Sequence, residues 1–530
     1  MRIAITISLL LISAAGFAQS GEVDQTFGNA GEQIYDIDDL DKLHGLIKDD
    51  GGNIYFYGGV SDNQGGIYPF DFFVGKMFPN GQLDLSFGSN GYLRGDFPNH
   101  EICFFQNAAL ADDGIIFMGN GRNFGQTDTN NFYLTKVDWT GQVDVSFANG
   151  GFFTDSLLGI YNTPGSVIVD SESKVVFCGS STDFQSTYVE YPFVGRLNPD
   201  GSRDSTFGQT GILLYDYYGN TIIDGMHVPD YPDRHGDGAY LDELIEINDN
   251  YFLIGKLTTT SYNQLHMMSF NKSGDFNADF VAQGLYPLQI DPGSNHQITD
   301  IQKKDSMVYM ALHTSGNLYA NQQIILPVTE KGLVQDVIAF EHESQDERSN
   351  FFLFHNEQLV VGGYSEEKDN TIPGHFSDEM VAYVLNSDGN FQNDFGLDGR
   401  FSYQSSNTDF EQGVDDAVIS NGSLVLGGYA NRIDGDNVTD FLFVSTVLEE
   451  DLQITEEPED SRLYPNPSKG FFFVPENATA LNCYSLDGKQ IFYERQGRQV
   501  LLSNNFQGVL LVTFELNTKV FSKKIVITEQ

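Results

Sequence analysis

The chain has 530 residues, of which 74 are Asp or Glu and only 28 are Lys or Arg, so its formal net charge is -46 at pH 7. This length exceeds what one ordinary hydrophobic core supports, and several domains or a repeat architecture are therefore expected. The charge argues against nucleic-acid and anionic-lipid binding, which depend on clustered Lys and Arg; divalent cations or basic partners fit better, and solubility outside the cell is the simpler explanation.

Residues 1–18 have the pattern of a secretory signal peptide. Arg2 supplies the positive start, an apolar run covers residues 3–17, and Gly16 and Ala18 are the small residues before a predicted cleavage after Ala18. A transmembrane anchor is the weaker interpretation, because the run is shorter than the ~20 apolar residues that span a bilayer. No later stretch is apolar enough, so no transmembrane segment is expected after processing.

A repeated turn with the frame Gly-x-x-Asp-x-Ser/Thr-Phe-Gly organises residues 19–448. The first four copies place their Phe residues 60 apart, and two weaker copies follow. These phenylalanines are Phe27, Phe87, Phe147, Phe207, Phe280 and Phe395. A degenerate copy begins near Gly332, in the gap between the last two. An apolar strand ending in glycine, as in residues 54–58, occurs six times, and a seventh copy has Ala311 in place of the glycine. Seven repeats are therefore predicted.

Each repeat contains short β-prone runs separated by turn formers. In the second repeat these runs are residues 91–96, 102–110, 115–119 and 131–137. Aromatic and β-branched residues are frequent, and no helical periodicity is sustained. Four strands in each of seven repeats predict an all-β fold, a seven-bladed β-propeller.

The aspartate of the repeated turn has two explanations. Asp24, Asp84, Asp144 and Asp204 recur at one position and could form a ring of metal sites. The same residues could instead accept hydrogen bonds from the turn backbone, with the hydroxyl before each Phe assisting. Turn chemistry is favoured, because the frame later carries Asn277 and Gln392 at this position.

The frame at 60-residue spacing resembles the delta-60 repeat family over roughly residues 21–448. This resemblance implies an exported bacterial propeller-like domain without a common enzymatic activity. Kelch propellers are the rival, since Gly-Gly pairs follow two of the apolar strands. Their repeats carry a tryptophan, however, and Trp139 is the only one here. WD40 repeats lack support for the same reason.

The composition changes after residue 448. Residues 449–461 form an acidic, self-repelling linker, and residues 462–530 contain alternating short strands that predict a small Ig-like β-sandwich. This segment is similar to the C-terminal sorting domain of type IX secretion. The matching residues are Tyr464, Pro465, Asn466, Pro467, Gly470, Asp487, Gly488, Lys489, Gly508 and Lys524. The resemblance implies contact with the type IX translocon and its sortase, removal of the module, and release or attachment to surface lipopolysaccharide. A generic adhesive or carbohydrate-binding Ig-like domain is the alternative.

Ligand contacts are expected in the loops that the repeats do not share. The fourth repeat is the longest, and its loop at 227–240 carries His227, Asp230, Asp233, His235 and Asp237. Metal or glycan contact is conceivable there, but the histidine spacing fits no zinc signature and a solvated loop is favoured. A second acidic loop, with Asp434, Asp436, Asn437 and Asp440, resembles a calcium loop only in fragments.

No catalytic signature is present, so no catalytic residue or cofactor is predicted, and calcium is the one candidate. The first hypothesis is a non-enzymatic propeller for recognition, adhesion or display of a glycan or protein ligand, located outside the cell or on its outer surface after passage through the periplasm. The second is a secreted glycan-active or other hydrolytic propeller enzyme. Convergent carboxylates together with a deep pocket in the channel would favour the second hypothesis, and a channel lined by Phe, Val and Gly would count against it.

Overall fold

The computed structural model shows a chain built from β-strands, with no α-helix among the residues it describes. These are residues 20–62, 69–123, 130–157, 161–183, 189–215, 221–222, 238–258, 263–281, 285–288, 295–315, 322–340, 347–368, 376–387, 389–397, 399–405, 408–432, 438–448, 463, 469, 471–475, 478–485, 489, 491–502, 506–516 and 519–528. The chain divides into two compact parts, Met1–Glu449 and Glu450–Gln530. Within the described residues, no helix has the length and apolar character to span a membrane.

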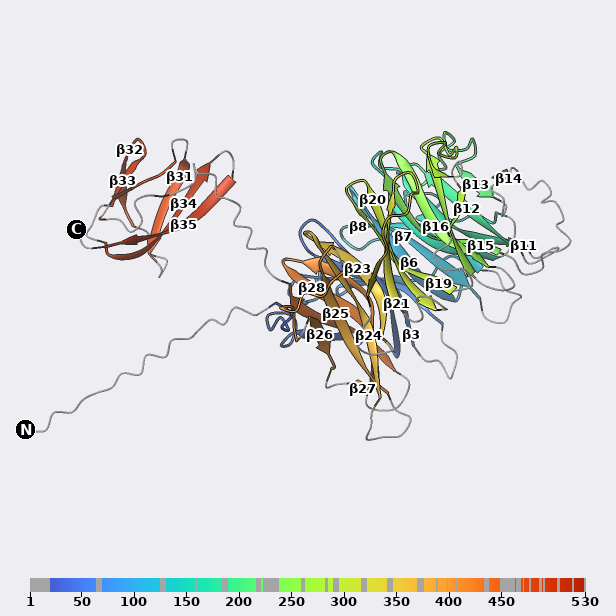
Figure 1. Cartoon of the computed structure of the whole chain (residues 1–530), viewed down its shortest axis with the longest axis horizontal. Helices are drawn as coiled ribbons and strands as arrows, with labels where there is room; N and C mark the ends of the chain where they lie inside the picture. The colour runs from blue at the N-terminus through green and yellow to red at the C-terminus, as the bar shows by residue number, and fades with distance from the viewer. Residues whose placement is uncertain are drawn as a thin grey trace, which may run out of the picture. The chain divides into compact units, whose positions relative to one another are not determined.

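The strands of the first part pair into successive antiparallel groups of four, here called blades (Figure 1). Blades 1 to 4 are β2–β5 (Leu40–Lys48, Ile54–Ser61, Asp71–Met77, Tyr92–Gly95), β6–β9 (Ile102–Ala111, Gly114–Arg122, Asn130–Asp138, Phe152–Phe153), β10–β13 (Tyr161–Val169, Val175–Asp183, Val189–Leu197, Ile212–Tyr215) with a short β14 (Thr221–Ile222), and β15–β18 (Gly238–Ile247, Asn250–Thr258, Asn263–Asn271, Leu285–Leu288). Blades 5 to 7 are β19–β22 (Asn295–Lys304, Met307–Ser315, Gln322–Thr329, Ile338–Phe340), β23–β26 (Glu347–His355, Gln358–Lys368, Phe376–Leu385, Arg400–Tyr403) and β27–β29 (Thr408–Ser420, Ser423–Arg432, Thr439–Val447) with β1 (Glu32–Tyr35).

The two ends of this part meet in blade 7. Strand β1 pairs antiparallel with β29, with Glu32 opposite Val444, so the N-terminal strand completes the last blade. In Figure 1 the blue N-terminal strands therefore lie among the orange strands of blade 7. The first strands of the blades also contact one another in the order β27, β2, β6, β10, β15, β19, β23 and back to β27. The all-β, propeller-like prediction is confirmed by this closed arrangement.

One detail of the predicted strand grouping is wrong. The sequence assigns residues 91–96 to the start of the second repeat, but β5 pairs with β4 and is the outermost strand of blade 1. The reason is the turn after each Phe, which returns the chain along the edge of the blade that it has just built. Each sequence repeat is thus offset by one strand from each blade, and the same offset leaves β1 to complete blade 7.

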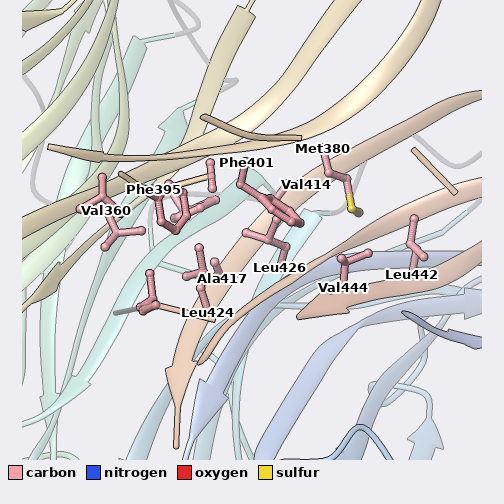
Figure 2. Packing of buried hydrophobic residues seen from close by; sticks show 14 of the residues in the cluster. Val360, Met380, Phe395, Phe401, Val414, Ala417, Leu424, Leu426, Leu442 and Val444 are labelled. Atoms are coloured by element: carbon pink, nitrogen blue, oxygen red, sulfur yellow. The ribbon is translucent and has the colours of Figure 1, made fainter. Parts of the chain in front are cut away.

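The hydrophobic cores lie between neighbouring blades, and the repeated Phe belongs to them. Phe395 packs with residues of blades 6 and 7, among them Phe401, Val414 and Leu426, as Figure 2 shows. Phe27, Phe87, Phe147, Phe207 and Phe280 each lie in the corresponding cluster of two adjacent blades, and all six are at most 3% exposed. Burial of this size stabilises the fold by ~1.5–3 kcal/mol for each Phe side chain.

The aspartate of the repeated turn is held by its own turn. Asp84 accepts hydrogen bonds from the Ser86 hydroxyl and the Ser86 backbone N–H, and it pairs with Lys76 at 2.9 Å. Asp144 accepts from Ser146 in the same way and lies near Lys136. Asp204 accepts from the hydroxyl and the backbone N–H of Thr206 and pairs with Arg196. These bonds lower the pKa of Asp84 against the opposing effect of its burial.

The second part contains two three-stranded antiparallel sheets over one core, a small β-sandwich. The first sheet joins β30 (Phe471–Phe473), β33 (Gln499–Leu502) and β32 (Tyr493–Gln496), and the second joins β31 (Thr479–Ser485), β34 (Gly508–Leu516) and β35 (Lys519–Ile527). Phe472, Cys483, Val500, Val512 and Ile525 are fully buried between them. Cys483, like Cys103 and Cys178, is a buried free thiol.

Candidate functional site at the propeller axis

The first strand of every blade has a β-bulge at the same register position. The pairing with the second strand shifts between Leu43 and Gly45 in β2, and between Val414 and Asp416 in β27. The other five inner strands shift at the equivalent point. A bulge leaves one residue without a cross-strand partner and redirects its side chain.

The bulged residue and the residue after it are mostly polar, although they lie in otherwise apolar strands. We call the following eleven residues the axial set: His44, Gln106, Asn107, Ser166, Asp242, Glu243, Thr299, Asp300, Asn350, Asp415 and Asp416. All but the buried Ser166 are half-buried. Polar side chains are thus concentrated where the inner strands of the blades face one another.

Electrostatic interactions show that these side chains converge. The pKa of Glu243 in blade 4 is raised, after the larger effect of burial, by the charges of Asp300 in blade 5 and Asp416 in blade 7. Burial raises the pKa of Tyr57 in blade 1, and the charges of the same three carboxylates raise it further. A Cβ on Gly45 would lie 2.3 Å from the Tyr57 hydroxyl, so the tyrosine fills the position that Gly45 leaves empty. Groups from opposite sides of the ring interact only if they project towards its axis.

Three members of the axial set accept hydrogen bonds from the backbone of a neighbouring blade. Asp416 accepts hydrogen bonds from the Leu46 N–H of blade 1 at 2.7 Å and from the Ala417 N–H at 2.7 Å. Asp300 likewise accepts from Phe352 N–H in blade 6 at 3.1 Å. Asn107 accepts from Val167 N–H in blade 3 at 3.1 Å. Because an inner strand has an unpaired edge, these side chains satisfy backbone donors that no strand reaches.

The carboxylates of the axial set hold protons at unusually high pH. Burial raises the pKa of Asp416 to about 6, despite the two backbone donors that lower it, and burial together with Asp416 raises the pKa of Asp300 to about 7. Burial and the Asp416 charge also raise the pKa of Asp415 to about 7, and burial raises the pKa of Glu243 to about 8. Near neutral pH the axis therefore contains both protonated and ionised carboxyl groups, the combination that general acid–base chemistry uses.

Two neutral members of the set have a buried polar atom without a hydrogen-bond partner among the described residues. These atoms are Nε2 of His44 in blade 1 and Oε1 of Gln106 in blade 2. Oδ2 of Asp242 in blade 4 also lacks a hydrogen bond there, but it is ion-paired with Lys256 at 3.3 Å. Burial, followed by the nearby Lys42, lowers the pKa of His44 to about 4, so its imidazole is neutral at pH 7. The charge of Lys42 also opposes the rise in the pKa of Asp415, so His44 and this blade 7 carboxylate both lie near Lys42. An unmet hydrogen-bonding group in a buried position is uncommon and requires an explanation.

Most sequence-predicted ligand residues lie outside the described residues. This holds for His227, Asp230, Asp233, His235 and Asp237, and for Asp434, Asp436 and Asn437. Asp440 is described; it is buried in β29, and its charge contributes to the raised pKa of Asp41, which burial chiefly causes. Among the described residues, no group of three or more His, Cys, Asp or Glu could hold a metal ion.

The sorting-motif residues divide in the same way. Tyr464, Pro465, Asn466, Pro467, Gly470, Asp487 and Gly488 lie outside the described residues. Lys489 is exposed, and its carbonyl accepts hydrogen bonds from the backbone N–H and the hydroxyl of Ser485. Gly508 is the first residue of β34 and lies opposite Ile527. Lys524 of β35 lies opposite Leu511 of β34.

The axial set itself was missed at the sequence level, although a signal for it exists. Glu243, Asp300 and Asp416 each stand in a β-prone run, eleven or twelve residues before the strand-ending glycine or its Ala311 replacement. Asn107 has the same position in the second repeat. A polar residue that recurs at a fixed distance from a repeat marker would have identified the position.

The fold and the tail together define a propeller-like protein that carries an export module. Residues 462–528 match the family described as the secretion system C-terminal sorting domain. This match confirms the type IX sorting tail and indicates export to the outer surface or the extracellular space. A search of curated proteins finds no match for the chain.

Several solved structures are similar to the chain only in outline. A protein of unknown function from Dyadobacter fermentans is 11% identical, covers 64% of this chain and 93% of its own, and has a TM-score of 0.35. A subtype N11 neuraminidase-like protein of A/flat-faced bat/Peru (H18N11) is 11% identical, covers 64% and 87%, and has a TM-score of 0.35. Bacillus subtilis levansucrase is 12% identical, covers 65% and 85%, and has a TM-score of 0.29. At these TM-scores the similarities carry no argument about function.

Proposed function

We propose that this protein is an exported, non-enzymatic propeller of delta-60 repeats that recognises, adheres to or displays a ligand at or beyond the cell surface. The sorting tail at 462–528 supports the export half of this proposal. In the proposed route, the signal peptide is removed after Ala18, the type IX translocon passes the chain through the outer membrane, and the sortase removes the tail. The mature protein is then released or attached to lipopolysaccharide.

One observation carries the non-enzymatic half. Asp416 and Asp300, two of the convergent carboxylates, already accept hydrogen bonds from backbone N–H groups of the next blade. A carboxylate whose oxygens are committed to the backbone is poorly placed to attack a substrate or to transfer a proton. Convergence of these acids is therefore explained by the assembly of the ring. The loops at 227–240 and 434–440 are the proposed places for further ligand contacts, and calcium is the proposed ion for the second.

The proposal is tested by localisation, by mass spectrometry of both ends of the mature protein, and by a turnover screen on glycans and peptides. We expect loss of residues 1–18 and of the tail from the surface or medium fraction, and no turnover. Mature surface protein that retains residues 463–530 would contradict the sorting route. Turnover that is lost in Asp415→Asn but kept in Asp144→Asn, a turn carboxylate of blade 2, would contradict the non-enzymatic assignment.

The second candidate function is a glycan-active or other hydrolytic enzyme. It is favoured by Glu243 and Asp415, whose pKa values burial raises to about 8 and about 7. A protonated Glu243 could act as a general acid while Asp415 is ionised. A bell-shaped pH–rate profile that loses its alkaline limb in Glu243→Gln would establish this function instead.

A further inference from the structure

The axial set is rich in hydrogen-bond acceptors. It contains five carboxyl groups, those of Asp242, Glu243, Asp300, Asp415 and Asp416. Its neutral members add the unpartnered Oε1 of Gln106 and the unpartnered Nε2 of His44. Carboxylate and amide oxygens accept hydrogen bonds, and a neutral imidazole has one nitrogen that also accepts.

The nearby cations do not balance these acids. Lys256 pairs with Asp242 at 3.3 Å, and Lys42 only partly offsets the rise in the pKa of Asp415 that burial and Asp416 cause. Around Glu243, the other influences are the like charges of Asp300, Asp242 and Asp416 and one hydrogen bond from Ser166. The mutual repulsion of the acids raises their pKa values in addition to burial, so the ring holds protons in place of the positive charge that it lacks.

We propose that the propeller axis is a binding site for an organic cation, an ammonium or guanidinium group such as a Lys or Arg side chain of a polypeptide. This inference rests on the proposed recognition function and names its ligand class. A guanidinium presents five N–H donors and no acceptor, which matches the carboxyl groups of Glu243 and Asp415 together with an amide oxygen and an imidazole nitrogen. The oxygens of Asp300 and Asp416 already accept from the backbone and add negative charge near the ligand. The acceptors come from separate blades, so a branched, multi-donor group engages more of them than a compact ion does.

Binding of a cation releases protons. The carboxyl groups with pKa values of about 7 to about 8 become ionised when a positive charge enters the ring, and the released protons pass to the buffer. Affinity for the cation therefore increases as the pH rises from ~6 to ~9, because less work is then spent on removing those protons. A neutral ligand produces neither effect.

The test is titration calorimetry of the purified protein with Nα-acetyl-arginine amide at pH 7, in two buffers of different ionisation enthalpy. Nα-acetyl-citrulline amide is the matched uncharged probe. We expect binding of the arginine probe with net proton release and at least about tenfold weaker binding of the citrulline probe. Glu243→Gln and Gln106→Leu should each weaken binding of the arginine probe by about tenfold, whereas Asp144→Asn on the outer turn should leave it unchanged.

Several results would overturn the inference. Equal binding of the two probes would show a neutral-ligand site, and displacement of the arginine probe by micromolar CaCl2 would show a metal site. Absence of heat with either probe, in protein whose thermal transition is normal, would show that the ring is only structural. These outcomes are separate from the proposed function, which fails on turnover or on localisation and not on the identity of the ligand.

Discussion

Replacing Phe87 by Ala tests whether the repeated Phe holds neighbouring blades together. Phe87 is 1% exposed, and its ring meets that of Tyr55 edge-on at 5.6 Å. A Cβ on Gly141 of the next repeat would lie 3.0 Å from the Phe87 ring, so the site is packed from both blades. Loss of a buried Phe from such a site costs ~3–5 kcal/mol. Leu85 is the control, since it stands two residues earlier in the same turn and is 70% exposed.

The assay is urea unfolding followed by the fluorescence of Trp139, the only tryptophan, whose ring lies 6.0 Å from that of Tyr55. Trp139 therefore reports on the blade interface under test. Phe87→Ala should lower the free energy of unfolding by ~3–5 kcal/mol, and Leu85→Ala by less than ~0.5 kcal/mol. Equal effects of the two substitutions, or a cost below ~1 kcal/mol for Phe87→Ala, would refute the interpretation of this residue as an anchor.

Three further predictions concern pH, backbone and tail. The pKa of Glu243 is raised from 4.5 to about 8 in the folded state, so its contribution to stability is present below pH 4.5 and is lost as the pH rises to about 8. Glu243→Gln should therefore flatten the decline in the free energy of unfolding that urea unfolding measures between pH 5 and 8. Gly88→Ala should cost more stability than Gly150→Ala in thermal unfolding, by ~1 kcal/mol or more: both have positive φ, but a Cβ on Gly88 would lie 2.3 Å from a backbone oxygen and one on Gly150 meets nothing within 4 Å. Deleting residues 462–530 should keep the protein inside the outer membrane in cell fractionation while leaving the unfolding transition of the first part unchanged, since the two parts have separate cores.

The sequence was informative where a residue's role is local and repeated. The turn Phe and its Asp could be interpreted from spacing alone, because each copy performs the same packing and hydrogen bonding within a few residues. The offset of β5 was not foreseen, since both blades offer an apolar edge and only the return direction of the turn decides between them.

The axial carboxylates were harder to predict for a physical reason. Glu243 and Asp416 share a local pattern, because each follows an Asp and lies between apolar residues. Their relation in space, however, depends on ring closure, which brings blades 4 and 7 to a common axis. A strand pattern gives the face of a sheet to which a side chain points, but it does not give the distance between sheets. The chain also has 74 acidic residues, so the composition alone does not identify the few that converge.

The pairing of β1 with β29 has a consequence for the order of assembly. Glu32 and Val444 meet although almost the whole propeller separates them in the chain, so this contact is available only after all the blades exist. Contacts of such high sequence separation form slowly, and the edge of β29 stays open until they form. In a chain that lacks its last repeats, β1 would have no partner strand. The pairing of β1 with β29 therefore distinguishes a closed ring from an incomplete one.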